Sequence, residues 1–185
     1  EDCADKNGNG IIETSKAPDD ILPWMSDECV RWSTKLPIEG SLNSGPRGVI
    51  WSPGEWDKDL CQFVNQKVWV GYLPFAGTAH MARLDGETGV VETTVSVPNW
   101  KEGYPDYGPY TAALDRDWNV WFTGVQGELF RINTSNGDTI ARWNPPKELR
   151  FYGMTVDPDG NPWFGGCAGP VSMFDQETEQ FTAIE

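Results

Sequence analysis

The segment nearest the N-terminus has a spacing of oxygen-bearing residues that is typical of a calcium-binding loop. The residues that define it are Asp5, Asn7, Asn9, Gly10 and Glu13 in the stretch DKNGNGIIE. They match the first nine positions of an EF-hand loop, in which oxygens at positions 1, 3 and 5 surround a hard cation while the chain turns. The glycine at position 6 permits the sharp bend. We therefore expect one bound Ca²⁺ here.

The remaining ligands follow from the same geometry, with one departure. Position 7 brings in the carbonyl oxygen of Ile11, and Glu13 ligates directly or through water. Position 12, where an EF-hand has a bidentate Glu, is Lys16, so we expect the missing carboxylate to come from Asp19 or Asp20. In this interpretation the ion is structural, because it stabilises a short segment with few apolar residues. The alternative is a plain Asn-Gly turn that holds no ion.

Four cysteines without a CxxC pair predict two disulfides, and a single His makes a zinc site unexpected. Cys3 and Cys29 bracket the calcium loop, and a bond between them closes about 27 residues and contributes about 3 kcal/mol. The remaining pair is Cys61 with Cys167. Disulfides form in oxidising compartments, so the expected location is extracytoplasmic: secreted, periplasmic or on the cell surface.

Few residues indicate catalysis. The sequence has none of the short motifs of serine hydrolases, zinc peptidases or P-loop enzymes, and a lone His such as His80 is typical of a structural hydrogen-bonding role. The aromatic residues outside the repeated positions are the other candidates. We expect Trp56, Trp100 and Tyr107, with His80, to contribute to a surface that binds a glycan or a protein. The alternative is that these rings pack long loops onto the strands.

The chain contains internal repeats. Asp115, Asp117, Asn119 and Trp121 recur 42 residues later as Asp157, Asp159, Asn161 and Trp163. Each unit reads as four short strands separated by turns rich in Asp, Asn and Gly. A third, looser copy covers 47–98 and carries the insertion SPGEWDKDLCQFVNQ at 52–66. The Asp-rich turns are expected to cap themselves by side-chain hydrogen bonds, without an ion.

Four antiparallel strands in about 42 residues is the size of one β-propeller blade. The predicted fold class is therefore all-β, built from three four-stranded antiparallel blades. We expect an N-terminal calcium-loop segment at 1–44 and a blade region at 45–185, with blades at about 45–98, 108–146 and 151–185. The repeated residues Trp69, Trp121 and Trp163 are predicted to lie in the core between blades.

Three blades do not close a ring, because propellers have four to eight. We expect that the natural chain continues past Glu185 with further blades, because nothing at that end reads as a terminal cap. The alternative is that two copies assemble into a six-bladed ring. The expected partner is therefore the remainder of the propeller, from the same chain or from a second copy.

The pattern GMTVDPDGNPWFGG followed by FDQETEQFT resembles the streptogramin-lyase-like (virginiamycin B lyase-like) propeller repeats of secreted bacterial proteins, and NHL-type repeats share much of it. The resemblance covers 47–185, and similar calcium loops often precede such propellers. The lyases of this family use a His and a Glu near magnesium in later blades. Repeats two and three contain no His, so no catalytic residue carries over. We expect a binding or structural module; the alternative is a lyase-like or hydrolytic enzyme whose catalytic residues lie outside this chain.

Composition narrows the function further. The chain has 28 acidic and 14 basic residues, a formal net charge of -14, which repels phosphate backbones and argues against nucleic-acid binding. No run of about 18 apolar residues occurs, so we expect no membrane-spanning helix. Ten Trp beside 20 Gly and 14 Pro are typical of short strands joined by many turns.

Overall fold

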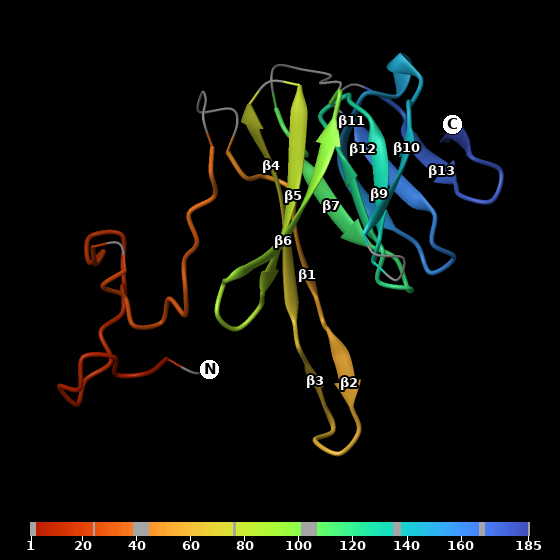
Figure 1. Ribbon diagram of the computed structural model, residues 1–185. Helices are drawn as coiled ribbons and strands as arrows, with labels where there is room; N and C mark the ends of the chain where they lie inside the picture. Colours follow the sequence, from red (N-terminus) through yellow and green to blue (C-terminus); the bar gives the residue numbers. More distant parts are fainter. Residues whose placement is uncertain are drawn as a thin grey trace.

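Aromatic and β-branched residues alternate with turn residues along most of the chain, and this pattern folds into strands. The computed structural model describes residues 3–23, 25–38, 45–75, 77–100, 107–134, 138–166 and 169–184. Within these ranges the protein is all-β, with three four-stranded antiparallel sheets and one two-stranded hairpin (Figure 1). The predicted fold class is confirmed at this level, and the described residues form no closed propeller.

Sheet 1 contains, in spatial order, β1 (Val49–Ser52), β4 (Lys67–Phe75), β5 (Thr78–Asp85) and β6 (Val91–Pro98). The insertion between β1 and β4 forms the hairpin of β2 (Glu55–Asp57) and β3 (Gln62–Val64). The hairpin starts at Gly54, whose φ of 79° lies in the left-handed region. A Cβ atom at this position would lie 2.1 Å from the carbonyl oxygen of Val64, so this turn requires glycine.

Sheets 2 and 3 are each built from one uninterrupted stretch of chain. Sheet 2 contains β7 (Thr111–Leu114), β8 (Val120–Thr123), β9 (Leu129–Asn133) and β10 (Thr139–Trp143). A short 3-10 helix, η3 (Lys147–Leu149), leads to sheet 3, which contains β11 (Phe151–Val156), β12 (Pro162–Gly166), β13 (Val171–Asp175) and β14 (Gln180–Ile184). The three sheets thus lie within the three repeats that the sequence predicts.

The repeated turns have the same hydrogen bonds in sheets 2 and 3. The Asp115 carboxylate accepts from the backbone N–H four residues later and, at 3.1 Å, from the indole Nε1 of Trp121. The Asp157 carboxylate accepts from the corresponding N–H and, at 2.8 Å, from Nε1 of Trp163. These carboxylates cap their own turns, as hairpin chemistry predicts, and the same bonds anchor the repeated Trp.

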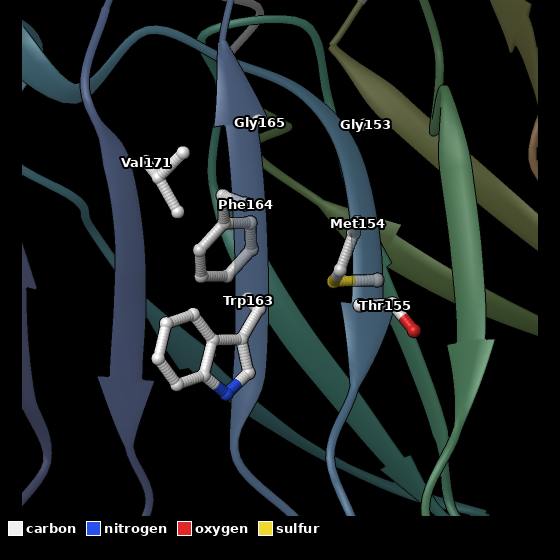
Figure 2. A pocket seen from close by; sticks show the side chains of 7 residues that line it. All are labelled: Gly153, Met154, Thr155, Trp163, Phe164, Gly165 and Val171. Carbon is white, nitrogen blue, oxygen red and sulfur yellow. The ribbon is translucent and has the colours of Figure 1, made fainter. Parts of the chain in front are cut away.

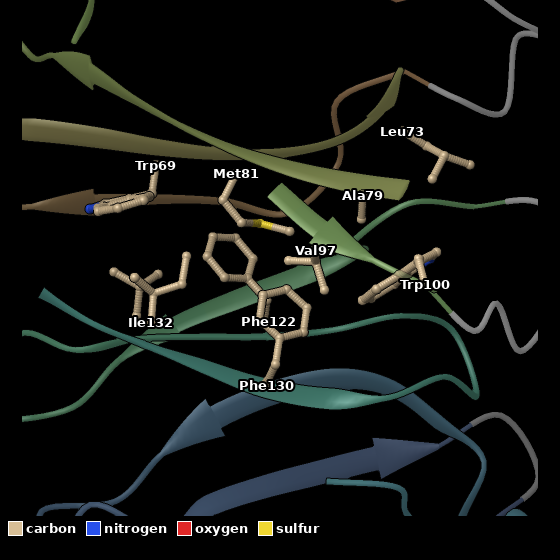
Figure 3. Close-up of a cluster of buried hydrophobic side chains, with 10 residues drawn as sticks. Trp69, Leu73, Ala79, Met81, Val97, Trp100, Phe122, Phe130 and Ile132 are labelled. Carbon is tan, nitrogen blue, oxygen red and sulfur yellow. The ribbon is translucent and has the colours of Figure 1, made fainter. Parts of the chain in front are cut away.

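The sheets stack face to face, with one apolar layer between sheets 1 and 2 (Figure 3) and another between sheets 2 and 3. The layer between sheets 1 and 2 contains Trp69, Leu73, Ala79, Met81, Val97, Trp100, Val120, Phe122, Phe130 and Ile132. The layer between sheets 2 and 3 contains Trp121, Leu129, Leu149, Phe151, Phe164 and Phe174. Strand β7 lies beside both β1 and β11, so the first strands of the three sheets meet at one inner edge. The three sheets therefore stack in chain order around this inner edge.

The opposite face of sheet 1 is covered by the N-terminal segment, whose described residues form no helix and no strand beyond the isolated bridge of Ala17 with Asp20. Trp32, Leu36 and Ile38 pack against the buried face of β4 and β5. The indole Nε1 of Trp32 also donates to the carbonyl oxygen of Gly86 at 3.0 Å. The segment therefore occupies the place that a preceding sheet would have.

Candidate functional site

The predicted calcium loop folds around the carboxylate of Asp5. One carboxylate oxygen accepts from the backbone N–H groups of Gly8 (2.7 Å) and Asn9 (3.2 Å), and the other accepts from Gly10 (2.6 Å). These bonds hold the pKa of Asp5 below its ordinary value, with the bond from Gly10 as the largest cause. The φ angles of Gly8 (76°) and Gly10 (88°) are left-handed, so both glycines are needed for this tight loop.

The other predicted side-chain ligands within the loop are joined by hydrogen bonds to one another. The amide Nδ2 of Asn7 donates to one carboxylate oxygen of Glu13 at 3.0 Å, and Nδ2 of Asn9 donates to the other at 2.6 Å. The structure thus brings Asp5, Asn7, Asn9 and Glu13 together in one loop. Carboxylate and amide oxygens are the donors that calcium prefers, so this set fits the ion chemically.

A second carboxylate, which the sequence analysis missed, fixes this loop from outside. Glu28 is buried, and its carboxylate accepts from the backbone N–H groups of Lys6 (2.7 Å), Asn7 (3.1 Å) and Glu13 (2.9 Å). The bond from Glu13 is the largest cause that lowers the pKa of Glu28. The signal in the sequence was its place beside Cys29, because a disulfide from Cys29 to the start of the loop carries residue 28 to it.

The disulfide of Cys3 with Cys29 is present, as predicted, with a Cα–Cα distance of 4.4 Å. The thiol of Cys61 is exposed at the tip of the β2–β3 hairpin. Cys167 lies outside the described residues, so its pairing with Cys61 stays a prediction.

Two further predicted ligands lie in a different turn. Asp19 and Asp20 follow the loop, and the backbone N–H of Asp20 donates to the carbonyl oxygen of Ala17 at 2.9 Å. Both residues are exposed. Within the described ranges, Glu28 instead supplies the carboxylate that contacts the loop from a residue after Glu13. Ile11 is exposed within the loop itself. No group of three His, Cys, Asp or Glu side chains with metal-site geometry occurs in the described ranges, so the expected ion depends on amide and backbone oxygens as well.

His80 lies on β5 and is half-buried. Its Nδ1 is 3.3 Å from the hydroxyl of Tyr72, and its Nε2 is 3.2 Å from Oγ of Ser96. Burial lowers the pKa of the imidazole. Both ring nitrogens are thus engaged with neighbours on the same sheet, which is the structural role that a lone His predicts.

The three aromatic candidates separate in space. Trp56 is exposed on the β2–β3 hairpin, where its ring meets Phe63 edge to face at 5.1 Å. Trp100 is buried in the layer between sheets 1 and 2, against Phe130, so it packs a connector onto the sheets instead of facing a ligand. Tyr107 is half-buried near the inner edge of the sheets.

Tyr107 belongs to a row of three tyrosines and one arginine at the inner edge of the three sheets. Tyr110 comes directly before β7, and Tyr152 lies 42 residues later near the start of β11. Their ring centroids are 5.0 Å apart and their hydroxyls are 2.8 Å apart. Arg47, two residues before β1, places its guanidinium 4.3 Å from the ring centroid of Tyr107. We call Arg47, Tyr107, Tyr110 and Tyr152 the inner-edge row.

The strand registers explain this row. Val49 pairs with Val70 in sheet 1, and Ala112 pairs with Phe122 in sheet 2, so Arg47 and Tyr110 hold equivalent positions before the first strand. The 42-residue repeat makes Tyr152 the counterpart in sheet 3. Tyr107 was predicted from the sequence but the row was not, although the 42-residue spacing of Tyr110 and Tyr152 indicated it.

No helix in the described part of the chain is long and apolar enough to cross a membrane. The chain matches no protein-family model, and a search of curated proteins found no match.

Proposed function

We propose that this protein is an extracytoplasmic β-propeller-type module that is stabilised by calcium and binds a glycan. The observation that supports a binding role is the inner-edge row, in which Arg47, Tyr110 and Tyr152 occupy the same position in three neighbouring sheets. Side chains that recur at one position of adjacent repeats form a continuous surface, and repeat folds commonly bind ligands along such surfaces. The disulfide of Cys3 with Cys29 supports an oxidising compartment.

The chemistry of the row fits a sugar better than an apolar ligand. Tyr152 is 45% exposed, and tyrosine combines a ring face with a hydroxyl that both donates and accepts. The guanidinium of Arg47 adds N–H donors at the other end of the row. A pyranose offers C–H groups for stacking and hydroxyls for hydrogen bonding, so it can use both features at once.

A glycan-binding assay tests this role. We expect an oligosaccharide panel to contain a binder whose affinity falls about 10-fold in Tyr152→Ala, because truncating an aromatic contact removes more than 1 kcal/mol. Trp118→Ala is the matched control, because Trp118 is 43% exposed and lies in a turn of sheet 2, away from the row. Equal loss in both variants, or no glycan bound by the native protein, refutes the glycan proposal.

The calcium proposal has support from the loop alone. Asp5, Asn7, Asn9 and Glu13 would hold the ion, and Glu28 would position the backbone around it. When bound, calcium would supply a central charge that orders a segment with few apolar contacts of its own. The bound ion would thereby help to hold the N-terminal segment against sheet 1.

A calorimetric titration of chelator-stripped protein tests this second point. We expect one calcium site in the native protein and its loss in Asp5→Ala. Asp19→Ala is the control for the alternative donor, and we expect it to bind as the native protein does, since Asp19 lies in a different turn after the loop. Absence of binding in the native protein reduces the motif to an Asn-Gly turn.

A further inference from the structure

The N-terminal loop contains two consecutive Asn-Gly steps, Asn7-Gly8 and Asn9-Gly10. Such steps are chemically labile, because glycine has no Cβ to hinder its backbone nitrogen. That nitrogen attacks the side-chain carbonyl carbon Cγ of the preceding Asn. The new N–Cγ bond closes a five-membered succinimide, the Cγ–Nδ2 bond breaks, and the displaced amide leaves as ammonia with the proton of the attacking nitrogen. Water then opens the ring to aspartate or isoaspartate, so this deamidation needs no other reactant.

Both attacking nitrogens are bonded to one carboxylate in the folded loop. The N–H of Gly8 donates to Oδ1 of Asp5 at 2.7 Å, and the N–H of Gly10 donates to Oδ2 at 2.6 Å. Bonds to an ionised acceptor are stronger than neutral ones. Attack also requires each nitrogen to lose its proton, and a negative charge this close opposes that loss. Asp5 therefore makes both nitrogens poor nucleophiles.

The rest of the loop does not protect the carbon that is attacked. Oδ1 of Asn7 accepts from the backbone N–H of Asn9 at 3.0 Å, and Oδ1 of Asn9 accepts from that of Ile11 at 2.8 Å. A donor at a carbonyl oxygen stabilises the charge that develops there during addition, as in an oxyanion hole. Both Asn-Gly steps are also exposed to water. The stability of the two amides thus depends on the bonds made by Asp5.

We propose that Asn7 and Asn9 form a deamidation site that the Asp5 carboxylate suppresses. Each Nδ2 now donates to one carboxylate oxygen of Glu13. Deamidation replaces that donor with a negatively charged oxygen, so Glu13 loses a hydrogen bond and faces a like charge. Conversion of one Asn therefore opens the loop in one direction only. The inference concerns the loop in the absence of an ion and does not rest on the calcium proposal.

Peptide mapping by mass spectrometry tests the role of Asp5. Native protein and Asp5→Asn are incubated in chelator, then reduced and digested with trypsin. Cleavage after Lys6 and Lys16 places Asn7 and Asn9 in one peptide that contains neither residue 5 nor a cysteine, and fragmentation locates the mass gain at each Asn.

The expected acceleration in Asp5→Asn differs between the two steps. Oδ1 of Asp5 accepts from two backbone N–H groups and Oδ2 from one, so the amide oxygen of the variant should keep the Oδ1 position and its bond to Gly8. Gly10 would then face an NH₂ group and lose its acceptor. We expect deamidation at Asn9 to be at least about 10-fold faster than in the native protein, which corresponds to the loss of one charge-assisted bond. The rate at Asn7 should rise less.

Asp27→Asn is the matched control. The Asp27 carboxylate also accepts from backbone N–H groups of the same segment, those of Ser15 (2.9 Å) and Cys29 (3.0 Å), but its printed partners include neither loop glycine. We expect both steps to keep their native rates in this variant. A third Asn-Gly step, at Asn136, lies outside the described residues and is read in the same digests as a reference for buffer and temperature.

Three results overturn the proposal. The first is a native loop that deamidates as fast as the reduced chain in urea, and the second is an Asp5→Asn variant whose Asn9 keeps the native rate. The third is equal acceleration in Asp27→Asn and Asp5→Asn, which would assign the protection to the order of the whole segment. All samples contain chelator, so failure of the calcium proposal leaves these rates unchanged.

Discussion

Trp121 and Trp163 provide a matched pair for measuring how much the covering of one sheet by the next stabilises the fold. They occupy the same repeat position, and each donates its indole N–H to the Asp six residues earlier, at 3.1 Å and 2.8 Å. Sheet 3 covers Trp121, whereas no described sheet lies over Trp163; within their own sheets, Trp121 is paired with Arg131 and Trp163 with Met173. Trp121 is 0% exposed and its ring centroid lies 6.0 Å from that of Phe174 of sheet 3, whereas Trp163 lines a hollow of about 300 Å³ (Figure 2).

Replacing each Trp with Ala should therefore have unequal effects. Removing a fully buried Trp costs about 3–5 kcal/mol, through lost burial and the cavity that remains. We expect this loss for Trp121→Ala. Trp163 buries one side against its own sheet, so about half of the apolar contact is at stake and the expected loss is about 2 kcal/mol. The hydrogen bond to Asp is lost in both variants and cancels in the comparison.

The assay is urea unfolding followed by circular dichroism, with Trp121→Ala and Trp163→Ala each compared with the native protein at the same protein concentration. The expected difference of about 2 kcal/mol corresponds to a 30-fold change in the unfolding equilibrium. Equal losses in the two variants would refute the reasoning, because they would mean that Trp163 is as well covered as Trp121.

Three further predictions follow from local features. Replacing Cys3 and Cys29 with Ser should lower the stability of the N-terminal segment by about 3 kcal/mol while the sheets unfold as before, as hydrogen exchange resolved by segment would reveal. The pKa of Asp85 is lowered from 3.8 to about 2, mainly by hydrogen bonds from the hydroxyl and the backbone N–H of Thr88. The stability that this carboxylate contributes is present above pH 3.8 and is lost as the pH falls through 2. The urea midpoint of Asp85→Asn should therefore fall less between pH 4 and pH 2 than that of the native protein. Trp118 has a left-handed φ of 63° at the turn position where sheet 3 has Gly160, and glycine adopts this conformation without strain. We therefore expect Trp118→Gly to raise the free energy of unfolding by up to about 1 kcal/mol, and a lower urea midpoint would contradict this.

The repeat was the most predictable part of the fold. Asp115 and Asp157 each accept a hydrogen bond from the backbone N–H four residues later, so both turns are stabilised within a few residues of sequence. Such local bonds require particular residues at fixed spacings, and these spacings can be recognised in the sequence. The insertion at 52–66 was recognised as extra chain, but its hairpin was not, because the pairing of Trp56 with Phe63 follows no repeated pattern.

The N-terminal contacts were harder to predict because they join residues far apart in sequence. The Asp5 loop has a local signature, and it was found. The carboxylate of Glu28 reaches the loop across more than twenty residues, and the loop motif has no spacing rule for that contact; only the neighbouring Cys29 pointed to it. The packing of Trp32 on sheet 1 was equally hard to predict. A single apolar residue in a segment without regular secondary structure belongs to no periodic pattern, so the sequence does not indicate which surface it packs against.

The order of the strands has a consequence for folding on the ribosome. Each sheet is completed by strands from one continuous stretch, and its pairings join strands that are neighbours in sequence once the β2–β3 hairpin is set aside. Such contacts close short loops, which is kinetically favourable for a β-protein. Sheet 1 can pair all its strands once Pro98 has emerged, before any residue of sheet 3 has been synthesised. Each new sheet would then find an apolar surface already formed by its predecessor, so synthesis from the N-terminus and growth of the stack proceed in the same direction.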